Sequence, residues 1–428
     1  MSRVLLTTLG SLGDLHPLIA IGLKLREREH EVAFCASATY RAKIESLGFG
    51  FHPLSPDLAP EGGSVGEVIK EIMDPMRGAE RLLRKYLFPQ LRSTYDDLRR
   101  AVAADGGADL LVSGELVYPA PLVAAKTGIR WASYITTPMS FFSAYDPPVL
   151  PPFPQAARFL RLLGLTVNRA GIALVKLVTR TWGAPVRRLR AEVGLPPGKD
   201  PICEGKHSPQ LVLALFSPVI AKPQRDWPRN TVVTGFPFYD GEPDQNPCPP
   251  ELRKFLELGE PPIVFTLGSS AVLDPGQFYH TSAEAARLLR RRAILLLGSN
   301  PPPPGLPAEV AAFGYVRFSD LFARVTAVVH QGGIGTTGHA LRAGCPMLVM
   351  PYNYDQPDNA ARMVRLGVGR VISRKRYSAE RVARELGRLL AEPRYRLTAK
   401  ELSLQMQSER GAEAACDALD RLLAPRTD

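Results

Sequence analysis

The chain has 428 residues, of which 45% are hydrophobic and 22% are charged, as in ordinary globular proteins. Its 36 glycines and 40 prolines are too few for a collagen-like or low-complexity chain, and the length accommodates two or three domains with full-sized cores. The net charge of +11 suits an anionic small molecule, a membrane surface or a nucleic acid as partner.

The cysteines and the apolar segments indicate the cellular compartment in which the protein is expected. The five cysteines are scattered and form no CxxC pair, which predicts neither a disulfide framework nor a structural zinc site. The first residues run into a strand pattern without the apolar core of a signal peptide, and the most apolar long stretch contains Asn168, Arg169 and Lys176. We therefore expect a cytoplasmic protein without a membrane-spanning helix.

In chain order, the first half alternates strand and helix patterns. Continuous apolar runs predict buried strands, and apolar residues at helical spacing predict the helices between them. The predicted strands are 4–9, 31–37, 110–113, 131–136 and 211–216, and the predicted helices are 15–28, 40–47 and 79–103. This alternation is typical of a parallel sheet with crossover helices.

From Pro147 to Ala191 the chain contains no aspartate or glutamate. Arginines and lysines alternate there with aliphatic residues, which predicts one or two basic amphipathic helices. Two interpretations remain open, namely a solvated face on packed helices and a peripheral contact of residues 158–190 with an anionic membrane.

Residues 237–262 are rich in proline and acidic residues, which predicts a linker between two domains. After the linker the alternation restarts. The predicted elements are strands at 263–267, 293–297, 328–330, 347–350 and 369–372, and a helix at 276–292. The predicted fold class is therefore α/β, with two doubly wound halves of similar size.

Two turns after strands carry candidate functional groups. The first, Leu9 to Pro17, lies where open α/β sheets bind ligands but lacks a GxGxxG fingerprint. Asp14 in this turn is either only a capping carboxylate or a functional group. The second turn presents Ser269 and Ser270, whose hydroxyls and backbone amides suit a phosphate, although many α/β loops share this composition.

The segment from His330 to Asn359 carries the strongest signal. His330 ends a strand, a glycine loop with Gly332 and Gly333 follows, and a helix begins near Gly335, just before Thr336. Loop amides, the helix N-terminus, the histidine and the threonine can together hold a diphosphate. Asp355 and Gln356 end the next strand and present a carboxylate and an amide, a pair suited to sugar hydroxyls.

These motifs resemble those of the family-1 glycosyltransferases of GT-B fold, in their bacterial form. The segment 330–356 is similar to the donor signature of that family, and 11–17 to its acceptor-side motif. Motifs at 207–210, 226–228 and 234–241 most resemble the rhamnosyltransferase chain of rhamnolipid synthesis.

The resemblance implies two Rossmann-like domains that face a central cleft. Residues 1–236 would form the acceptor-binding domain and residues 263–400 the nucleotide-sugar-binding domain. Residues 401–428 would form a helix that packs back on the N-terminal domain.

The resemblance also implies a reaction. Without a metal or cofactor, a sugar would pass with inversion from a dTDP- or UDP-linked donor to a hydroxyl of an apolar acceptor, either a lipid or an aromatic or terpenoid natural product. Asp14 takes the place of the general base of the family, with His16 as the alternative. His330, Thr336, the loop amides and the serines at 269 and 270 would stabilise the leaving diphosphate.

Further roles follow from the same resemblance. Tyr315 and Val316 lie where the family stacks a ring on the nucleotide base and reads it with a backbone amide; packing of Tyr315 in the core is the alternative interpretation. His339 stands where many relatives have a glutamate that holds the ribose hydroxyls, so a deoxyribose donor is favoured and a UDP-sugar stays open. The aromatic residues that imply an apolar acceptor site are Tyr118, Phe141, Phe142, Tyr145, Phe153 and Phe159.

Three other functions are weighed. A nucleotide-sugar 2-epimerase shares the fold but needs further acids and bases around the sugar ring. A catalytically silent lipid- or nucleotide-binding relative is disfavoured because Asp14, His330 and the pair at 355 and 356 are all present. A nucleic-acid-binding protein is suggested by charge alone, and no basic-aromatic module supports it.

Overall fold

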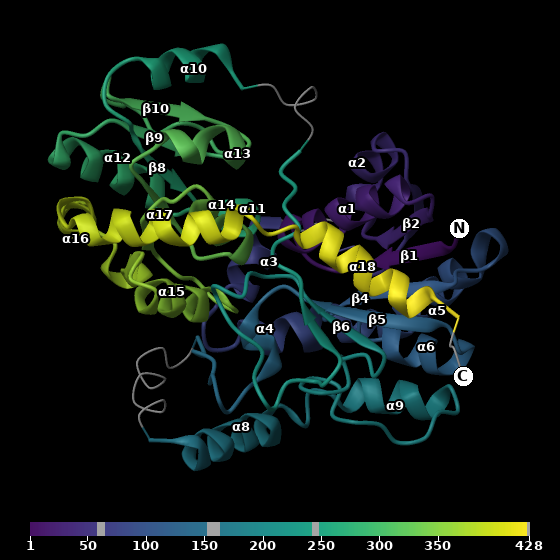
Figure 1. Cartoon of the computed structure of the whole chain (residues 1–428). Helices are drawn as coiled ribbons and strands as arrows, with labels where there is room; N and C mark the ends of the chain where they lie inside the picture. The colour runs from purple at the N-terminus through teal and green to yellow at the C-terminus, as the bar shows by residue number, and fades with distance from the viewer. Residues whose placement is uncertain (58–64, 152–162, 242–247, 426–428) are drawn as a thin grey trace.

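The computed structural model describes residues 1–57, 65–151, 163–241 and 248–425. Two sheets of parallel strands, each flanked by helices, make up the two halves of the molecule (Figure 1). The GT-B fold predicted from the sequence is confirmed by this architecture and by the solved structures compared below.

The N-terminal sheet has the strand order β3-β2-β1-β4-β5-β6-β7. Its strands are β1 (Arg3–Thr7), β2 (Glu31–Ala36), β3 (Gly50–Pro53), β4 (Leu110–Gly114), β5 (Arg130–Ile135), β6 (Leu211–Ala214) and β7 (Thr231–Val233). The central strands β4 and β6 are buried along their whole length, because helices cover both faces of the sheet.

The C-terminal sheet repeats this topology, with the strand order β10-β9-β8-β11-β12-β13. Its strands are β8 (Ile263–Thr266), β9 (Ala293–Leu296), β10 (Val310–Phe313), β11 (Ala327–His330), β12 (Met347–Val349) and β13 (Gly369–Val371). In each sheet the chain order reverses beside the first strand, at β1/β4 and at β8/β11. The carboxyl ends of parallel strands bind ligands at such a switch point.

The helices of the N-terminal half connect and cover its sheet. They are α1 (Leu12–Glu27), α2 (Arg41–Ser46), α3 (Val65–Ile72), α4 (Gly78–Arg81), α5 (Leu91–Ala103), α6 (Ala120–Thr127), α8 (Leu165–Thr179) and α9 (Ala184–Glu192). The single helix predicted over 79–103 changes its winding, with a π-helical segment at Leu82–Leu87 and a tight turn at Phe88–Gln90. Pro89 lies in that turn, where its missing N–H prevents a regular α-helix from continuing.

The helices of the C-terminal half cover the second sheet in the same way. They are α10 (Pro250–Glu257), α11 (Gly268–Ala271), α12 (Phe278–Leu289), α13 (Phe318–Leu321), α14 (Ile334–Arg342), α15 (Gln356–Arg365), α16 (Ala379–Ala391) and α17 (Pro393–Gln407). None of the helices in the described residues combines the length and the apolarity needed to cross a bilayer.

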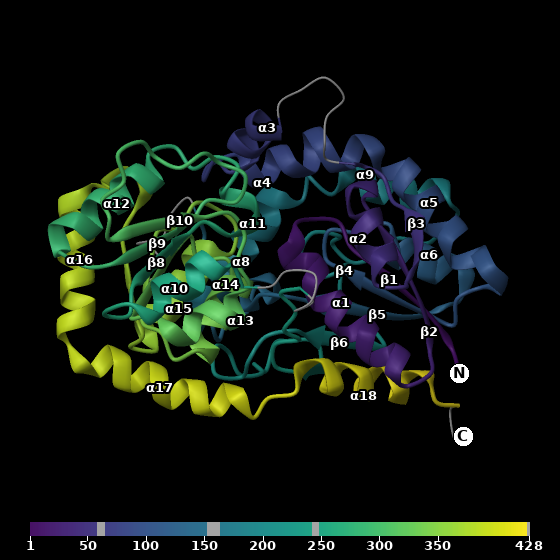
Figure 2. The ribbon, with the colours of Figure 1, turned by 90° about the horizontal axis from the view of Figure 1, so that it is seen from above.

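The C-terminal helices run along both halves (Figure 2). Helix α17 packs on α14, and α18 (Gly411–Leu423) packs on α1 and adds Cys416 and Leu419 to the core of the N-terminal half. The segment between α17 and α18 is the return crossing of the chain to the N-terminal half. It contacts the start of the linker, because a side chain at Gly411 would lie 2.3 Å from the backbone of Phe236. The two connections between the halves therefore meet at one place.

A second set of contacts joins the halves at α15. The buried Arg362 donates to Asp358 (2.7 Å) on its own helix and to Asp146 (2.5 Å) of the N-terminal half. The carboxylate of Asp358 also accepts a hydrogen bond from the backbone N–H of Val149 (2.9 Å). These ion pairs fix α15, and with it the start of that helix, against the N-terminal half.

Candidate active site

Asp14 lies at the carboxyl end of β1, in the first turn of α1. Its Oδ2 accepts a hydrogen bond from the backbone N–H of Ser11 (3.0 Å), while the Ser11 Oγ accepts from the N–H of Gly13 (3.2 Å), which together cap the helix. Gly10 has φ 143°, and a side chain there would lie 2.3 Å from the Asp14 carboxylate. Glycine is therefore required for the carboxylate to fold back over the loop.

Burial raises the pKa of this half-buried Asp14 to about 7, and the negative charge of Glu115 raises it further. Burial likewise raises the pKa of Asp355 to about 7, with contributions from the charges of Asp14 and Glu115. The three carboxylates follow β4, β1 and β12, so they come from both halves of the molecule.

His16 makes a different set of contacts. Its Nε2 lies 2.8 Å from the Nζ of Lys43, and its ring packs edge-on against Tyr239 at 5.3 Å. Burial lowers the pKa of His16 to about 3, and the charge of Lys43 contributes. The imidazole is therefore neutral, and its Nε2 accepts a hydrogen bond from the ammonium group.

His330 ends β11 and is completely buried. Its Nδ1 accepts a hydrogen bond from the backbone N–H of Gly332 (3.0 Å), so the proton of the neutral ring is on Nε2. That Nε2 is buried and has no partner among the described residues. Burial lowers the pKa of the ring to about 3, so His330 offers a neutral N–H donor to a ligand.

The glycine loop after β11 is tied to α15. Asn359 donates from Nδ2 to the carbonyl of Gly332 (2.9 Å) and to the Asp355 carboxylate (2.6 Å). The Oε1 of Gln356 accepts hydrogen bonds from the backbone N–H groups of Tyr352 (2.8 Å) and Asn353 (3.3 Å). The loop and the residues predicted to bind the sugar are therefore parts of one hydrogen-bonded unit.

The predicted phosphate loops face a residue that the sequence analysis missed. Gly333 caps α14, and Gly268, with φ 63°, begins α11. A side chain at either glycine would lie within 3 Å of the Gln331 amide, at 2.3 Å from Gly268 and 2.7 Å from Gly333. Gln331 thus lies between the two loops, and its buried Oε1 has no partner among the described residues. Thr336 is buried in the first turn of α14, whereas Ser269 is exposed and Ser270 is half-buried.

The linker lies against the residues predicted to bind the nucleotide base. Tyr315 is 51% exposed, and its hydroxyl donates to the carbonyl of Asp240 (2.7 Å), while the side chain of Val316 is in the core. His339 packs edge-on against Phe238 (4.8 Å) and Phe318 (5.5 Å). Burial lowers the pKa of His339 to about 4, so it is neutral at pH 7.

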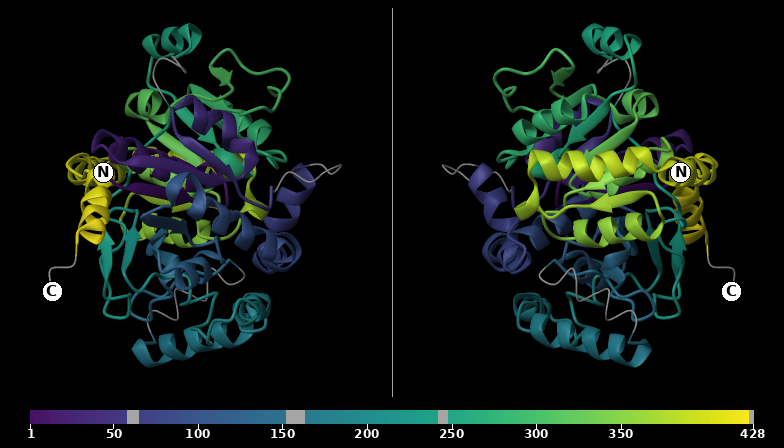
Figure 3. Two further views of the ribbon diagram at one scale, coloured as in Figure 1. Left: turned by 90° about the vertical axis from the view of Figure 1, so that its right-hand side faces the viewer. Right: turned by 90° about the vertical axis from the view of Figure 1, so that its left-hand side faces the viewer.

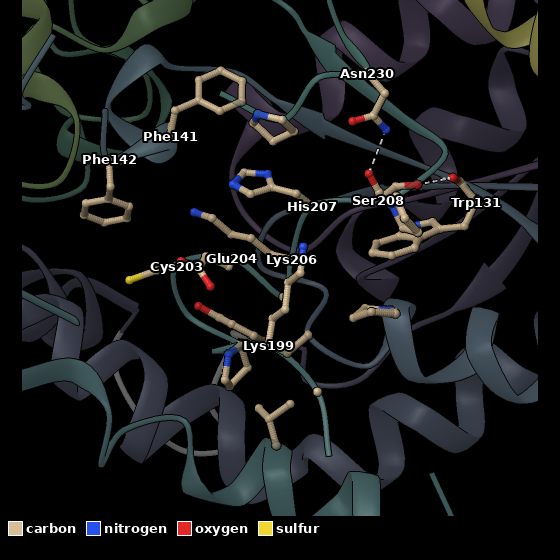
Figure 4. A pocket seen from close by; sticks show the side chains of 18 of the residues that line it. Trp131, Phe141, Phe142, Lys199, Cys203, Glu204, Lys206, His207, Ser208 and Asn230 are labelled. Carbon is tan, nitrogen blue, oxygen red and sulfur yellow. Dashed lines mark hydrogen bonds between the residues drawn. The ribbon is translucent and has the colours of Figure 1, made fainter. Parts of the chain in front are cut away.

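The predicted acceptor residues are distributed around a groove of about 1170 Å³ in the N-terminal half, which Figure 4 shows from close by. Tyr118, Phe141 and Phe142 line the groove, and Phe141 stacks on Trp227 at 4.1 Å. Tyr145 does not line it. The other two predicted aromatics, at 153 and 159, lie outside the described residues.

A buried ion pair at this groove was not predicted. Lys206 Nζ donates to Glu115 Oε2 (2.5 Å), whose other oxygen accepts from the Ser140 hydroxyl (2.8 Å). Glu115 lies two residues after the strand predicted at 110–113, and Lys206 precedes the motif at 207–210. Both positions were therefore marked by their neighbours, but their contact joins residues 91 apart in the chain. Among the described residues, no group of three or more His, Cys, Asp or Glu side chains is arranged to hold a metal ion.

Comparisons with known proteins identify the class. Residues 4–96 match the glycosyltransferase family 28 N-terminal domain, and residues 297–419 match the erythromycin biosynthesis protein CIII-like C-terminal domain. The chain is 33% identical to O-mycaminosyltylonolide 6-deoxyallosyltransferase of Streptomyces fradiae, over 99% of this chain and 98% of that protein. It is 32% identical to glycosyltransferase GtfE of Amycolatopsis orientalis, over 97% of both chains.

Solved structures agree in fold. The glycotransferase of kitacinnamycin superposes with a TM-score of 0.71 at 20% identity, covering 99% of both chains. The spinosyn rhamnosyltransferase SpnG superposes with a TM-score of 0.67 at 16% identity, covering 98% of this chain and 100% of its own. The chain therefore belongs to the GT-B glycosyltransferases of family 1, and the predicted enzyme class is confirmed. The finer resemblance to the rhamnolipid enzyme gains no support from these relatives, since the rhamnosyltransferase among them is a neighbour in fold only.

Proposed function

We propose that this glycosyltransferase moves a sugar from a dTDP-sugar to a hydroxyl of an apolar natural product, with inversion and without a metal ion. The observation that carries the proposal is the buried Nε2–H of His330, a donor without a partner at the switch point of the C-terminal sheet. An N–H donor buried in this way costs free energy unless a ligand completes its hydrogen bond.

Asp14 is the proposed general base. Its raised pKa of about 7 makes it a stronger base than an ordinary carboxylate while leaving half of it ionised at pH 7. His16 is the weaker alternative, because its Nε2 already accepts a hydrogen bond from Lys43.

The reaction is a single displacement. The acceptor oxygen forms a bond to the anomeric carbon as the bond from that carbon to the diphosphate breaks. The hydroxyl proton passes to Asp14, and the electron pair leaves with the diphosphate. One displacement at the anomeric carbon inverts its configuration.

The leaving diphosphate gains negative charge, which neutral donors can stabilise. The Nε2–H of His330, the N-terminal amides of α14 and the Thr336 hydroxyl are the proposed donors. The nine-residue α14 begins at the glycine loop, so its N-terminal dipole favours the same charge. These groups supply the role that a divalent cation plays at other diphosphate sites, and on this ground we propose metal independence.

The choice of dTDP rests on His339 and on neighbours in fold. A neutral histidine packed between Phe238 and Phe318 is no carboxylate acceptor for a ribose 2′-hydroxyl. Two structural neighbours, SsfS6 and VinC, are described in complex with thymidine diphosphate or dTDP. The acceptor class is suggested by relatives named for O-mycaminosyltylonolide and for vancomycin aglycone.

A donor screen tests the proposal. The protein is incubated with dTDP-, UDP- and GDP-sugars, and protection against thermal unfolding is measured. We expect the largest shift with dTDP-sugars, and transfer to a hydroxylated aromatic acceptor with inverted configuration. Release of free nucleotide from UDP-sugars without any acceptor would instead favour a 2-epimerase.

We also propose that α8 contacts an anionic membrane. The helix stands at the outer edge of the N-terminal half (Figure 3). The exposed side chains Leu163, Val167, Leu174, Leu177 and Val178 form one stripe, opposite the buried Asn168 and Thr179 of the helix. No acidic residue occurs between 163 and 191. Lys176 and Arg187 pair with acids from elsewhere in the chain, whereas Arg180, Arg188 and Arg190 form no ion pair with a described residue, so the segment keeps a positive charge. Residues 158–162 of the predicted basic stretch lie outside the described residues.

Co-sedimentation with vesicles tests this contact. We expect binding to phosphatidylglycerol vesicles, weaker binding to phosphatidylcholine vesicles, and loss of binding in Leu174→Glu. The control is Leu404→Glu on α17, which replaces an equally exposed leucine (70%) elsewhere. Equal loss in both variants, or no preference for the anionic lipid, would refute the proposal.

A further inference from the structure

The groove in the N-terminal half is longer than the catalytic site requires. It begins at Phe142 and Lys206, beside Glu115, and continues to Trp131, Gln210 and Asn230 at the amino ends of β5, β6 and β7. Its volume of about 1170 Å³ is that of a site for a whole small molecule. One end of the groove therefore lies beside Glu115, whose charge acts on Asp14. The other end lies at the opposite edge of the sheet, where β5, β6 and β7 begin.

The walls of the groove are strongly basic. Seven lysines and arginines line it against two acidic residues, Glu204 and Asp226. Glu204 is paired with Lys176, and Asp226 accepts hydrogen bonds from the Ser143 hydroxyl (2.6 Å) and the Ala144 N–H (2.7 Å). Glu204 therefore neutralises Lys176, which is one of the seven cations, and the carboxylate of Asp226 is held by neutral donors.

Three of the cations have no such partner. Arg169, Lys199 and Arg229 form no ion pair and no side-chain hydrogen bond with any described residue, whereas Lys206 is neutralised by Glu115. Figure 4 shows the Lys199 side chain rising into the groove toward His207. Burial lowers the pKa of His207 to about 3, and the positive charges of Lys206 and Lys199 also contribute. A positive field in a cleft with apolar walls concentrates anions.

Two buried nitrogens add a second, independent sign of a ligand. Trp227, which is 6% exposed, has no partner for its Nε1–H, and the Nδ1 of His207 also has none among the described residues. Both residues line the groove and flank Phe141, at 4.1 Å for Trp227 and 5.5 Å for His207. An indole N–H can only donate, so it is completed by an acceptor atom.

We propose that this groove binds an acceptor that carries a carboxylate, with its aromatic part against the half-buried Phe142 and its anionic group toward Lys199. The inference rests on the proposed function and narrows the substrate class from an apolar acceptor to an anionic amphipathic one. Arg169 and Arg229 extend the positive field along the groove, and the hydroxyl to be glycosylated lies at the Lys206 end, beside Glu115.

The test uses a matched pair of acceptors, a hydroxynaphthoate and its methyl ester. For the wild type we expect kcat/KM to be about tenfold higher for the acid, with the advantage shrinking at high salt. Lys199→Glu is expected to remove the advantage of the acid over the ester. The control is Arg381→Glu on α16, which changes the charge equally on an exposed surface of the other half.

A binding measurement tests whether the groove holds a carboxylate independently of sugar transfer. Calorimetric titration with naphthoate and with naphthalenemethanol, at constant ionic strength, requires no turnover. We expect naphthoate to bind more tightly than the alcohol in the wild type and in Arg381→Glu, and equally weakly in Lys199→Glu.

Equal affinities of the wild type for naphthoate and the alcohol, or equal loss in the two charge variants, would overturn the inference. If naphthoate binds as expected but no sugar is transferred to any hydroxyl, the groove stands and the proposed function fails.

Discussion

Replacement of Asp14 by asparagine tests the catalytic site and its energetics together. Asparagine keeps the size of the side chain, and its amide oxygen can still accept the hydrogen bond from the Ser11 N–H that caps α1. The variant therefore removes the charge and the proton acceptor while the helix cap remains. We expect transfer to fall about 10²–10⁴-fold, the usual contribution of a general base.

The pH dependence of the wild type follows from the raised pKa of Asp14. Because the base must be ionised, kcat/KM should be half-maximal near pH 7 and should fall tenfold per pH unit below it. The pKa of Asp355 is also about 7, so the acid limb reports the pair rather than either residue alone. Asp14→Asn should remove the part of this limb that belongs to Asp14, so that the remaining pH dependence is that of Asp355 alone.

The same shift makes a prediction for stability. The folded-state pKa of Asp14 lies above the ordinary value near 4, so the folded state binds the proton more tightly than the unfolded chain. Stability is therefore lost as the pH rises from about 4 through 7. The difference corresponds to at most about 4 kcal/mol, and solvent access to the half-buried carboxyl reduces it to about 1–2 kcal/mol.

Urea unfolding at pH 8 and pH 4 measures this effect. Asp14→Asn should be more stable than the wild type at pH 8, by about 1–2 kcal/mol, and should lose that advantage at pH 4. A variant with near-normal turnover would refute the assignment of the base. A collapse of activity in His16→Ala with normal activity in Asp14→Asn would give the role to His16.

Four further predictions concern the donor site and the contact between the halves. His330→Ala should weaken binding of every nucleotide sugar about 5- to 150-fold, measured by titration, whereas Asp355→Ala and Gln356→Ala should change the preference among sugars on one nucleotide. His339→Glu should shift the ratio of kcat/KM for dTDP-glucose and UDP-glucose toward UDP, and an unchanged ratio would contradict the ribose argument. Transfer should proceed fully in EDTA, and dependence on added Mg²⁺ or Mn²⁺ would disprove metal independence. Arg362→Met should lower the free energy of unfolding by about 3–5 kcal/mol, because it leaves Asp358 and Asp146 without their buried cation; a change below 1 kcal/mol in urea unfolding would contradict this.

The central strands could be predicted from the sequence because they are buried on both faces. The apolar runs predicted as strands at 4–9, 263–267 and 328–330 become β1, β8 and β11, and the switch points follow from them. The strands that the sequence analysis missed, β3, β7 and β10, are all at edges of the sheets. An edge strand has one neighbour and is partly exposed, so its own residues carry a weak apolar signal.

The contacts of the site also differ in how far they could be predicted from the sequence. Groups within one loop, such as Ser11 with Asp14 or His330 with Gly332, act on neighbours close in the chain, and the sequence marked both loops. The pairing of Lys206 with Glu115 depends on how distant loops meet above the sheet. No local pattern encodes such a contact.

The contact between the start of the linker and the segment between α17 and α18 determines how the two halves can move relative to each other. Gly235 and Phe236 lie against Glu409 and Gly411, and Ser217 donates a hydrogen bond to the Glu409 carboxylate at the same place. Two connections at separate points would hold the halves rigidly, whereas two connections at one point act as a single hinge. Each half can rotate about it without stretching either connection. The ion pair of Arg362 with Asp146 and the hydrogen bonds that Asn353 and Tyr354 donate to the carbonyl of Ile72 also join the halves, so these contacts must break before the halves can move apart.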